Sequence, residues 1–529
     1  NFEVTGGVVS LTASQNWGDI NMTGGRLIGQ AGTTITSAGI IDVAAGATFG
    51  SAGIVNGDIN VLGTLSPGAS PGTMTVNGDV TMAAGSHLLI ELTPAAGTDL
   101  LDVNGTLNIA NGAAIDITGA LDNLPGAVLD IVTADAITGR FTTVNKSSTV
   151  FGFVVQNGNR IQIRSEFQAG DDLPTNVAAS VAYANQVLRE GYGVQAFTGA
   201  LNVLTAADGT INQRAFAQLT PEAYGSALQA GVENALQLAD AVRVLKMSAP
   251  ARDGLYGFAQ SLIGGGDIDG QANTGASRAD LKSSGFFGGI GYGMGEGRMQ
   301  VGAFLGKTGT DQDLSALHAR TESDGWTAGV YADAAFDGLG VHGLIAYSDA
   351  DADTTRNLMV SATPAKGDYS LKSWLVDVGA DYRLDMGGMA VTPNVGVTYV
   401  NAKRSDVVED GAGDFALAVE GDSEDAWFAD AAVTVSGTFG IEGMAFHPYA
   451  GLGVRQMLSD SNILVTGTFN GAPGAPIVVN GGERDETAFR VGVGFDLDLT
   501  EKVRFYSGYT GEFGGTERSN FTAGVSVRF

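Results

Sequence analysis

Hydrophobic and polar residues alternate with a period of two through the second half of the chain. Alternating runs begin near twelve positions: Leu255, Ser284, Met299, Gly325, Val341, Tyr369, Ala390, Trp427, Ala445, Ala488, Val503 and Asn520. Tight turns lie around Gly295, Gly338, Gly387, Gly440 and Lys502, whereas the other connections are mostly long and acidic. Short turns, long loops and an even strand number predict a 12-stranded antiparallel transmembrane β-barrel.

The two faces of each run differ as a membrane requires. In one run Trp374, Val376 and Val378 share a face, and Ser373 and Asp377 share the other. A soluble β-sandwich would bury the apolar face but has no use for so many charged opposite faces, so we expect lipid outside and water inside. Aromatic residues at the run ends predict girdles at the two membrane surfaces: Trp326, Phe336, Tyr399, Trp427, Phe439, Phe521 and Phe529.

Residues 1–165 carry a different pattern, in which Gly, Asn and Asp punctuate short β-runs. An element such as Asn-Gly-Asp-Ile-Asn-Val recurs at 18–22, 56–61, 77–82 and 104–109. Spacings near 20 residues, or a multiple, indicate one rung per repeat in a right-handed parallel β-helix, whose rungs bury their apolar faces by stacking. The alternative is an ordinary β-sandwich with similar turns.

Helical patterning follows the polar segment 166–175, first at 177–190 and then at 211–219. The best-marked helix begins at Thr220-Pro-Glu222, where Thr can cap, Pro suits the first turn and Glu complements the helix dipole. It can continue to about Met247, before Pro250. A helix of that length spans about 40 Å, enough to cross a membrane.

The polar face of this helix excludes contact with lipid. It carries Gln229, Glu233, Asn234, Gln237, Asp240 and Arg243, followed by Lys246. A twelve-stranded pore, intermediate between filled eight-stranded barrels and open sixteen-stranded porins, should admit about one helix. We therefore expect an α-helical linker that threads the barrel lumen; the alternative is a helix packed in a soluble linker domain.

The amino-acid composition argues against several classes of function. No run of 18 apolar residues exists, which excludes a transmembrane helix. The formal charge of −29 argues against nucleic-acid binding and is typical of a soluble acidic surface. Cys is absent, which suits passage through a narrow pore in an oxidising compartment. Asn1 begins inside a β-like segment, so we expect any export signal to have been removed.

Catalytic and metal-binding patterns are lacking. The histidines are scattered and form no metal-spaced pair: His87, His318, His342 and His447. Gly421-Asp-Ser423 lacks a partnered His, and the run 349–353 lacks the Gly and distal Glu of a calcium loop. We expect no catalytic residue, no cofactor and no metal.

Three segments carry a family resemblance. The terminal face formed by Phe521, Ala523, Val525, Val527 and Phe529 resembles the signal by which outer-membrane barrels are recognised for assembly. The segment 63–79 (GTLSPGASPGTMTVNGD) is similar to the passenger-associated transport repeat, and 99–165 resembles a pertactin-type passenger end. The chain therefore resembles the monomeric autotransporters of type Va secretion along nearly its whole length.

The resemblance implies a domain order and a transport function. Expected domains are β-helical rungs (1–97), a passenger cap or autochaperone (98–168), a linker (169–220), the lumen helix (221–250) and the translocator barrel (251–529). The autochaperone core would comprise Leu101, Val103, Leu107, Ile109, Ile115, Ile117, Leu129 and Ile131. Some members cleave themselves at a lumenal Asn, but the residues around Asn234 do not match that pattern.

Expected partners are outer-membrane lipid, the barrel-assembly machinery and periplasmic chaperones, with no nucleic acid and a monomeric chain. The protein would lie in the bacterial outer membrane, with the passenger at the cell surface, exported by stepwise β-helix folding. We expect no enzyme in this chain. Two alternatives remain: a passive porin with a plugging N-terminal domain, and an outer-membrane enzyme with its site in the long loops.

Overall fold

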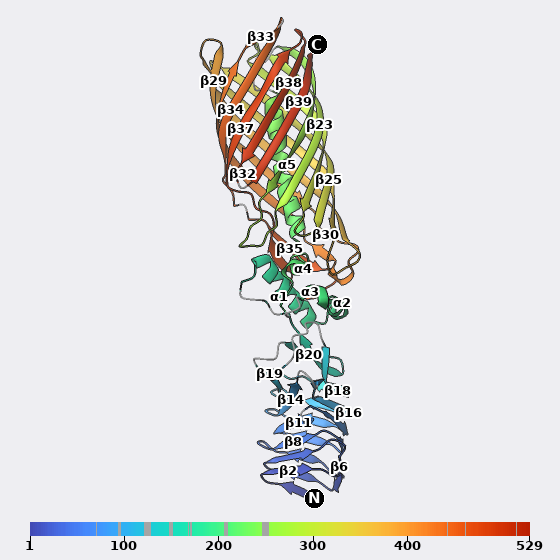
Figure 1. Ribbon diagram of the computed structural model, residues 1–529. Helices are drawn as coiled ribbons and strands as arrows, with labels where there is room; N and C mark the ends of the chain where they lie inside the picture. Colours follow the sequence, from blue (N-terminus) through green and yellow to red (C-terminus); the bar gives the residue numbers. More distant parts are fainter. Residues whose placement is uncertain are drawn as a thin grey trace. The chain divides into compact units, whose positions relative to one another are not determined.

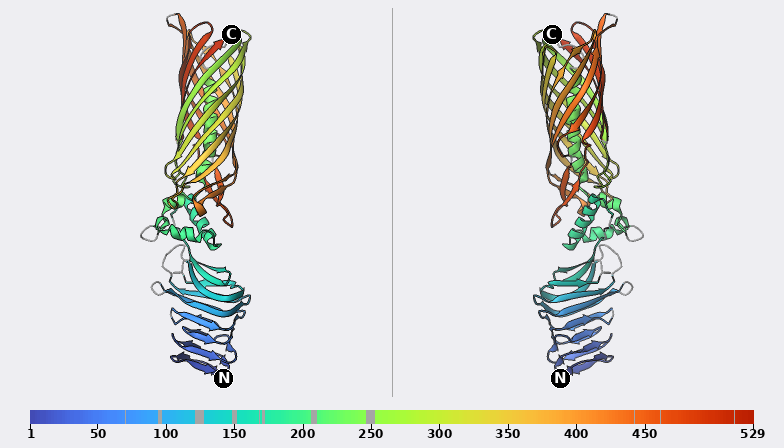
Figure 2. Two further views of the ribbon diagram at one scale, coloured as in Figure 1. Left: turned by 90° about the vertical axis from the view of Figure 1, so that its right-hand side faces the viewer. Right: turned by 90° about the vertical axis from the view of Figure 1, so that its left-hand side faces the viewer.

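The computed structural model describes residues 1–69, 71–93, 97–120, 128–147, 152–167, 169, 172–205, 210–245, 253–441, 443–460, 462–514 and 516–529. The chain divides into two compact units, residues 1–170 with 184–211, and residues 171–183 with 212–529. Figures 1 and 2 show a stack of short strands in the first unit and a barrel in the second. Among the described residues, no helix is both long and apolar enough to cross a membrane.

The first unit is a parallel β-solenoid in which three rows of strands alternate along the chain. The first row is β1 (Phe2–Val4), β4 (Ile20–Met22), β7 (Ile41–Val43), β10 (Ile59–Val61), β13 (Val80–Met82), β16 (Leu100–Ile109) and β18 (Val128–Gly139). The second row is β3 (Gln15–Trp17), β6 (Thr34–Ser37), β9 (Ile54–Asn56) and β12 (Thr73–Asn77), joined to the first by the long β16. The third is β2 (Val8–Leu11), β5 (Arg26–Gly29), β8 (Thr48–Ser51), β11 (Thr64–Pro67), β14 (His87–Thr93), β17 (Ala114–Gly119) and β19 (Thr143–Lys146).

The recurring sequence element forms one corner of the solenoid. Asn104 donates to Asn77 at 2.8 Å, and Asn77 donates to Asn56 at 2.7 Å, so the repeated asparagines form a ladder. Beside this ladder Ile20, Ile41, Ile59, Val80 and Leu107 pair in register and are buried. The rung at Ile41–Val43 has the apolar residues without the Asn-Gly-Asp signature, which explains the double spacing in the sequence. Parallel pairing excludes the sandwich alternative.

The end of the solenoid changes to antiparallel pairing. Strand β20 (Gly152–Asn157) pairs with β21 (Arg160–Ser165), and β21 pairs antiparallel with β18. The two-residue β15 (Gly97–Thr98) folds back antiparallel on β14. The pairing with β21 occupies the edge of β18 that a further parallel rung would otherwise use.

Five α-helices lie between solenoid and barrel in the described sequence: α1 (Thr175–Arg189), α2 (Val194–Gly199), α3 (Leu201–Leu204), α4 (Gln213–Ala217) and α5 (Glu222–Val244). The helix predicted at 177–190 corresponds to α1, and the one at 211–219 to the shorter α4. The helices α2 and α3 were not predicted, since their short segments carry no clear periodicity.

The described part of the second unit contains a closed barrel of twelve antiparallel strands. They are β22 (Gly254–Ile268), β23 (Ala279–Met294), β24 (Met299–Leu314), β25 (Ala319–Phe336), β26 (Leu339–Arg356), β27 (Ala365–Tyr382), β29 (Met389–Arg404), β32 (Asp422–Gly437), β34 (Met444–Met457), β37 (Thr487–Asp498), β38 (Val503–Phe513) and β39 (Thr516–Arg528). Pairing of β22 with β39 closes the ring. Every predicted run corresponds to one strand, and the tight turns are extended by β28 (Leu384–Asp385) and β33 (Phe439–Ile441).

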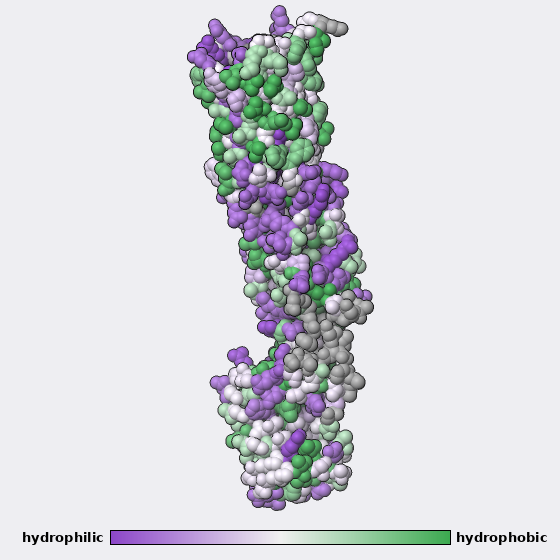
Figure 3. Space-filling view, turned by 60° about the vertical axis from the view of Figure 1, so that its left-hand side comes forward, coloured by the Kyte–Doolittle hydropathy of each residue, from purple (hydrophilic) through white to green (hydrophobic). Residues whose placement is uncertain are grey.

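The outer wall of the barrel is apolar, as alternation predicts. Phe286, Leu305, Val330, Ile345 and Leu452 all point outward and are exposed. On the face drawn in Figure 3, hydrophobic side chains cover the barrel wall, and hydrophilic ones gather at both of its ends. This distribution matches a hydrocarbon layer bounded by two polar surfaces.

Candidate functional site

Helix α5 occupies the lumen of the barrel (Figure 1). Near its N-terminus the Glu222 carboxylate accepts a hydrogen bond from Asn176 at 3.1 Å and another from the amide of Ser277, in the long connection after β22. Near its C-terminus, Arg243 reaches Asp377 in the middle of β27, and Val244 approaches Gly508 of β38. The helix therefore runs from the long-loop end of the barrel toward the short-turn end.

The predicted N-terminal cap of this helix needs correction. Thr220 does not cap it: the hydroxyl donates to the carbonyl of Ala217 at 2.8 Å, and Pro221 occupies the cap position without a side-chain hydrogen bond. The cap residue is displaced because Thr220 completes the turn that follows α4. At the other end α5 stops at Val244, and the predicted continuation through Lys246 and Met247 lies outside the described residues.

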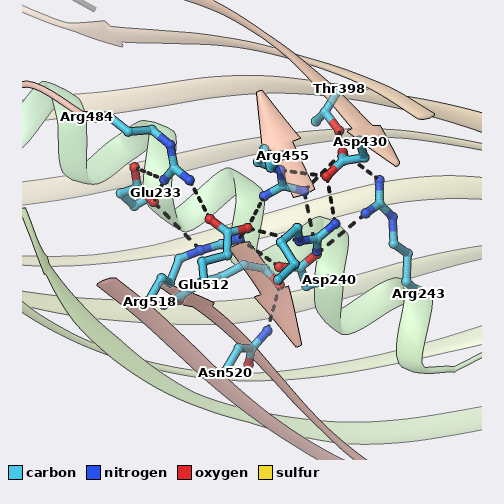
Figure 4. A network of polar contacts seen from close by, with 12 residues as sticks. Glu233, Asp240, Arg243, Thr398, Asp430, Arg455, Arg484, Glu512, Arg518 and Asn520 are labelled. Carbon is cyan, nitrogen blue, oxygen red and sulfur yellow. Dashed lines mark hydrogen bonds and ion pairs between the residues drawn. The ribbon is translucent and has the colours of Figure 1, made fainter. Parts of the chain in front are cut away.

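A network of buried ions joins α5 to one side of the barrel wall (Figure 4). We call it the lumen charge network; in the described chain it consists of Glu233, Asp240, Arg243, Asp377, Asp430, Arg455, Arg484, Arg490, Glu512 and Arg518. These are five carboxylates and five guanidinium groups, so their formal charges cancel. Arg455 donates to Asp430 at 2.9 Å and to Glu512 at 2.6 Å.

The helix supplies both signs of charge to this network. Asp240 pairs with Arg490 and, at 2.8 Å, with Arg518. One turn further on, Arg243 lies between Asp377 and Asp430, with Nη2 3.6 Å from a carboxylate oxygen of Asp430. Because acidic and basic helix residues face partners of opposite sign, a shift of the helix along the pore would bring like charges together.

The other side of α5 meets uncharged polar groups. Asn234 accepts a hydrogen bond from Thr310 at 3.0 Å, and Gln237 accepts one from Ser283 at 2.5 Å. Gln312 donates to the carbonyl of Ser226 at 2.8 Å. Gln229 donates to Glu233 within the helix at 3.0 Å. The lumen wall therefore has a charged side that extends from Asp377 on β27 to Arg518 on β39, and a neutral side on β23 and β24.

The long loops form a small sheet over the entrance that α5 uses. It contains β30 (Val407–Val408), β31 (Leu417–Val419), β35 (Leu464–Phe469) and β36 (Ile477–Asn480), with the 3-10 turn Gly413–Phe415. Val465 and Gly481 approach Gly225 so closely that a Cβ there would lie 2.3 Å from the Val465 side chain. The helix and the loop sheet thus pack without space between them.

A buried ion pair anchors the loop sheet to the barrel. Glu409 receives hydrogen bonds from Arg356 at 2.6 and 2.7 Å and from the hydroxyl of Tyr224 at 2.6 Å. Burial alone would raise the pKa of Glu409, but the charge of Arg356 and these hydrogen bonds hold it below its usual range. One carboxylate therefore connects a loop, a barrel strand and the lumen helix.

The residues proposed for membrane contact and assembly lie on the outer wall. Phe521, Val525, Val527 and Phe529 of the terminal segment are exposed on one face with Ala523. The aromatic residues expected in girdles point outward as well, and neighbouring rings lie against them at a tilt. The ring centroids of Tyr347 and Trp374 are 4.9 Å apart, and those of Tyr399 and Trp427 are 4.6 Å apart. Aromatic rows of this kind are typical of the membrane–water boundary.

The residues proposed as an autochaperone core all belong to one hydrophobic cluster in the solenoid. Seven are buried and Leu129 is partly buried against them. Other candidates do not converge: His87 contacts Asp116, His318 contacts Arg214, and His447 contacts Asp498. Among the described residues no group of three or more His, Asp or Glu side chains could hold a metal.

Comparison with known proteins concerns the barrel. The model of the Autotransporter beta-domain family matches residues 259–510. The translocator domain of autotransporter NalP from Neisseria meningitidis is 17% identical, with TM-score 0.47 over 58% of this chain and 99% of that one. The beta domain of the Bordetella autotransporter BrkA is 16% identical, with TM-score 0.41 over 52% and 100%. The transport unit of autotransporter AIDA-I from Escherichia coli is 14% identical, with TM-score 0.41 over 59% and 100%. The comparison with curated proteins gave no match.

Proposed function

We infer that this chain, which carries an Autotransporter beta-domain and is located in the bacterial outer membrane, secretes or displays its own N-terminal part, residues 1–168, at the cell surface. One observation carries the proposal: α5 runs through the lumen from the long-loop end, whereas β22 begins at the short-turn end. The chain that precedes the barrel therefore passes through the pore.

Folding of the solenoid supplies a direction for export. No nucleotide is available at the outer membrane, so outward movement needs another source of free energy. Each rung that stacks outside gains contacts with its neighbour and cannot slip back. The apolar residues of 101–131 would form the first core if the C-terminal rungs emerge first.

Assembly of the barrel completes the proposal. The outward face of β39, from Phe521 to Phe529, is the segment we assign to recognition by the barrel-assembly machinery, with periplasmic chaperones acting before insertion. The unit of function would be a monomer, because the ring of strands closes within one chain. No catalytic role is proposed for the residues described.

External proteolysis of intact cells tests this function. A tag inserted near Gly32 is expected to be removed by protease while the barrel stays protected. A tag that is cut only after the outer membrane is broken would place residues 1–168 in the periplasm. The alternative, a porin with a plugging domain, would then replace the display function.

A further inference from the structure

The Pro-Gly loop of the segment 63–79 contacts an acidic residue of the next rung. The loop joins β11 to β12 and contains Gly68 and Gly72. The amide of Gly72 donates to Oδ1 of Asp99 at 2.9 Å, across 27 residues, and the amide of Leu100 donates back to the carbonyl of Gly72 at 3.0 Å. Gly72 is thus bound on both sides by the chain that follows it.

Gly68 makes room for the Asp99 carboxylate. Its φ of +82° is a left-handed conformation that glycine adopts readily. A Cβ on Gly68 would lie 2.0 Å from Oδ1 of Asp99, so no other residue fits while the carboxylate is in place. The sequence of the loop is therefore matched to the residue of the following rung.

Asp99 is a buried carboxylate held by backbone amides. It is 3% exposed. Its second oxygen accepts from the amide of Glu91 at 2.9 Å, while its own amide donates to the carbonyl of Glu91 at 3.0 Å. No Lys or Arg pairs with it among the described residues. Burial of a carboxylate without a cationic partner costs free energy, and the hydrogen bonds from the two backbone amides offset that cost.

In the contact between Gly72 and Asp99 the acceptor lies later in the sequence than the donor. A contact at another corner of the solenoid has the opposite order. At the corner before β6, the amide of Thr34 donates to the hydroxyl of Ser14, which lies 20 residues earlier. There the acceptor precedes the loop that it caps. At the Pro-Gly corner the acceptor follows the loop, so a rung that folds first from the C-terminal side already presents the carboxylate.

We propose that Asp99 is a positioning residue for passenger folding: it is the preformed acceptor on which the Pro-Gly loop of the preceding rung closes as that loop leaves the pore. The inference rests on the proposed display function and adds a specific residue to it. Its geometry suits folding from the C-terminal rung toward the N-terminal one, in which the emerging loop of Gly68 and Gly72 meets a carboxylate that is already fixed.

Export kinetics of the full chain test the proposal. A tag near Gly32 is followed with external protease after a pulse of synthesis, in the wild type, Asp99→Ala, Asp99→Asn and Ser14→Ala. We expect Asp99→Ala to delay tag exposure about tenfold, the factor given by loss of the charge-assisted hydrogen bond from the Gly72 amide, which is the one that closes the loop. Asp99→Asn keeps one acceptor oxygen and should show a smaller delay. Ser14→Ala removes a contact that forms after the Pro-Gly loop has closed and should match the wild type.

Each result has one meaning. Wild-type export rates for both Asp99 variants, or an equal delay for Ser14→Ala, would overturn the inference and leave the display function intact. A wild-type tag that never reaches the surface would instead overturn the display function. If Asp99→Ala is degraded, Asp99→Asn decides, with hydrogen exchange of the Gly72 and Glu91 amides in the purified full chain reporting whether the loop has opened.

Discussion

Arg484 donates from one nitrogen to both carboxylate oxygens of Glu233 at 2.7 Å, although 251 residues separate the two along the chain. Both side chains are almost fully buried, at 1% and 2% exposure. The pair joins the lumen helix to the loop before β37. Since neither charge can reach bulk water, each depends on the other, and Arg484 also donates to Glu512.

Replacement of Glu233 should therefore destabilise the filled barrel. In Glu233→Gln the Arg484 guanidinium stays buried with one fewer carboxylate, and the free energy of unfolding should fall by about 3–5 kcal/mol. Denaturant unfolding in detergent micelles measures this. The matched control is Asn234→Ala, which removes a hydrogen bond to Thr310 and should cost about 1 kcal/mol. An equal loss of unfolding free energy for the two variants would show that the ion pair contributes no more to stability than a neutral hydrogen bond.

Some residues of the lumen charge network could be placed from the sequence, and Arg484 could not. Period-two alternation already places Asp377 and Arg490 on lumen-facing positions, because parity along a strand decides which face a residue occupies. The same parity assigns Glu512 and Arg518 once β38 and β39 are aligned. Arg484 has no such signal, because it lies in a long loop whose path depends on contacts made after the barrel closes.

In the solenoid, too, features that repeat along the sequence could be predicted, whereas contacts between distant residues could not. The Asn-Gly-Asp corners are visible because they recur, and they predicted the stack of rungs. The contact between Gly72 and Asp99 could not be predicted, because it needs the register between two rungs of different length. Thr220 was assigned wrongly for a related reason: the turn after α4 uses its hydroxyl before α5 begins.

Removal of α5 should open the pore. Deletion of 221–247 takes Glu233, Asp240 and Arg243 out of the lumen, and the wall side chains that remain would be hydrated. In planar bilayers, we expect a single full-length chain to conduct little. The deletion variant should show a large, steady ionic current. A full-length chain that conducts as well as the deletion variant would favour the porin alternative.

Charges in the solenoid core should stop export. Leu107 and Ile117 are fully or almost fully buried in the cluster that would fold first. Leu107→Asp with Ile117→Asp puts two unpaired carboxylates there, and the C-terminal rungs should no longer stack. We expect the tag near Gly32 to stay protected from external protease in intact cells.

The neighbouring outward positions supply the control for that variant. Asn108 and Thr118 follow the two core residues and point away from the core. Asn108→Asp with Thr118→Asp adds the same charge without entering the core, so display should remain near the wild-type level. Normal display of the Leu107/Ile117 variant would contradict a role for this core in export.

Acid should release the loop sheet from the barrel. The folded pKa of Glu409 lies below its usual value of 4.5, because Arg356 stabilises the charged form more than burial disfavours it. A carboxyl group of this kind contributes stability above its unfolded pKa, and the contribution disappears as the pH falls through the folded pKa. Cleavage of the loop at 405–421 by a protease that is active in both acid and neutral solution should therefore increase below pH 4.5. Glu409→Gln lacks the titrating group, so its loop should be cleaved faster at neutral pH and should gain little further on acidification. If both proteins show the same rise in acid, the anchor between Glu409 and Arg356 does not control the loop, and other carboxylates must account for the change.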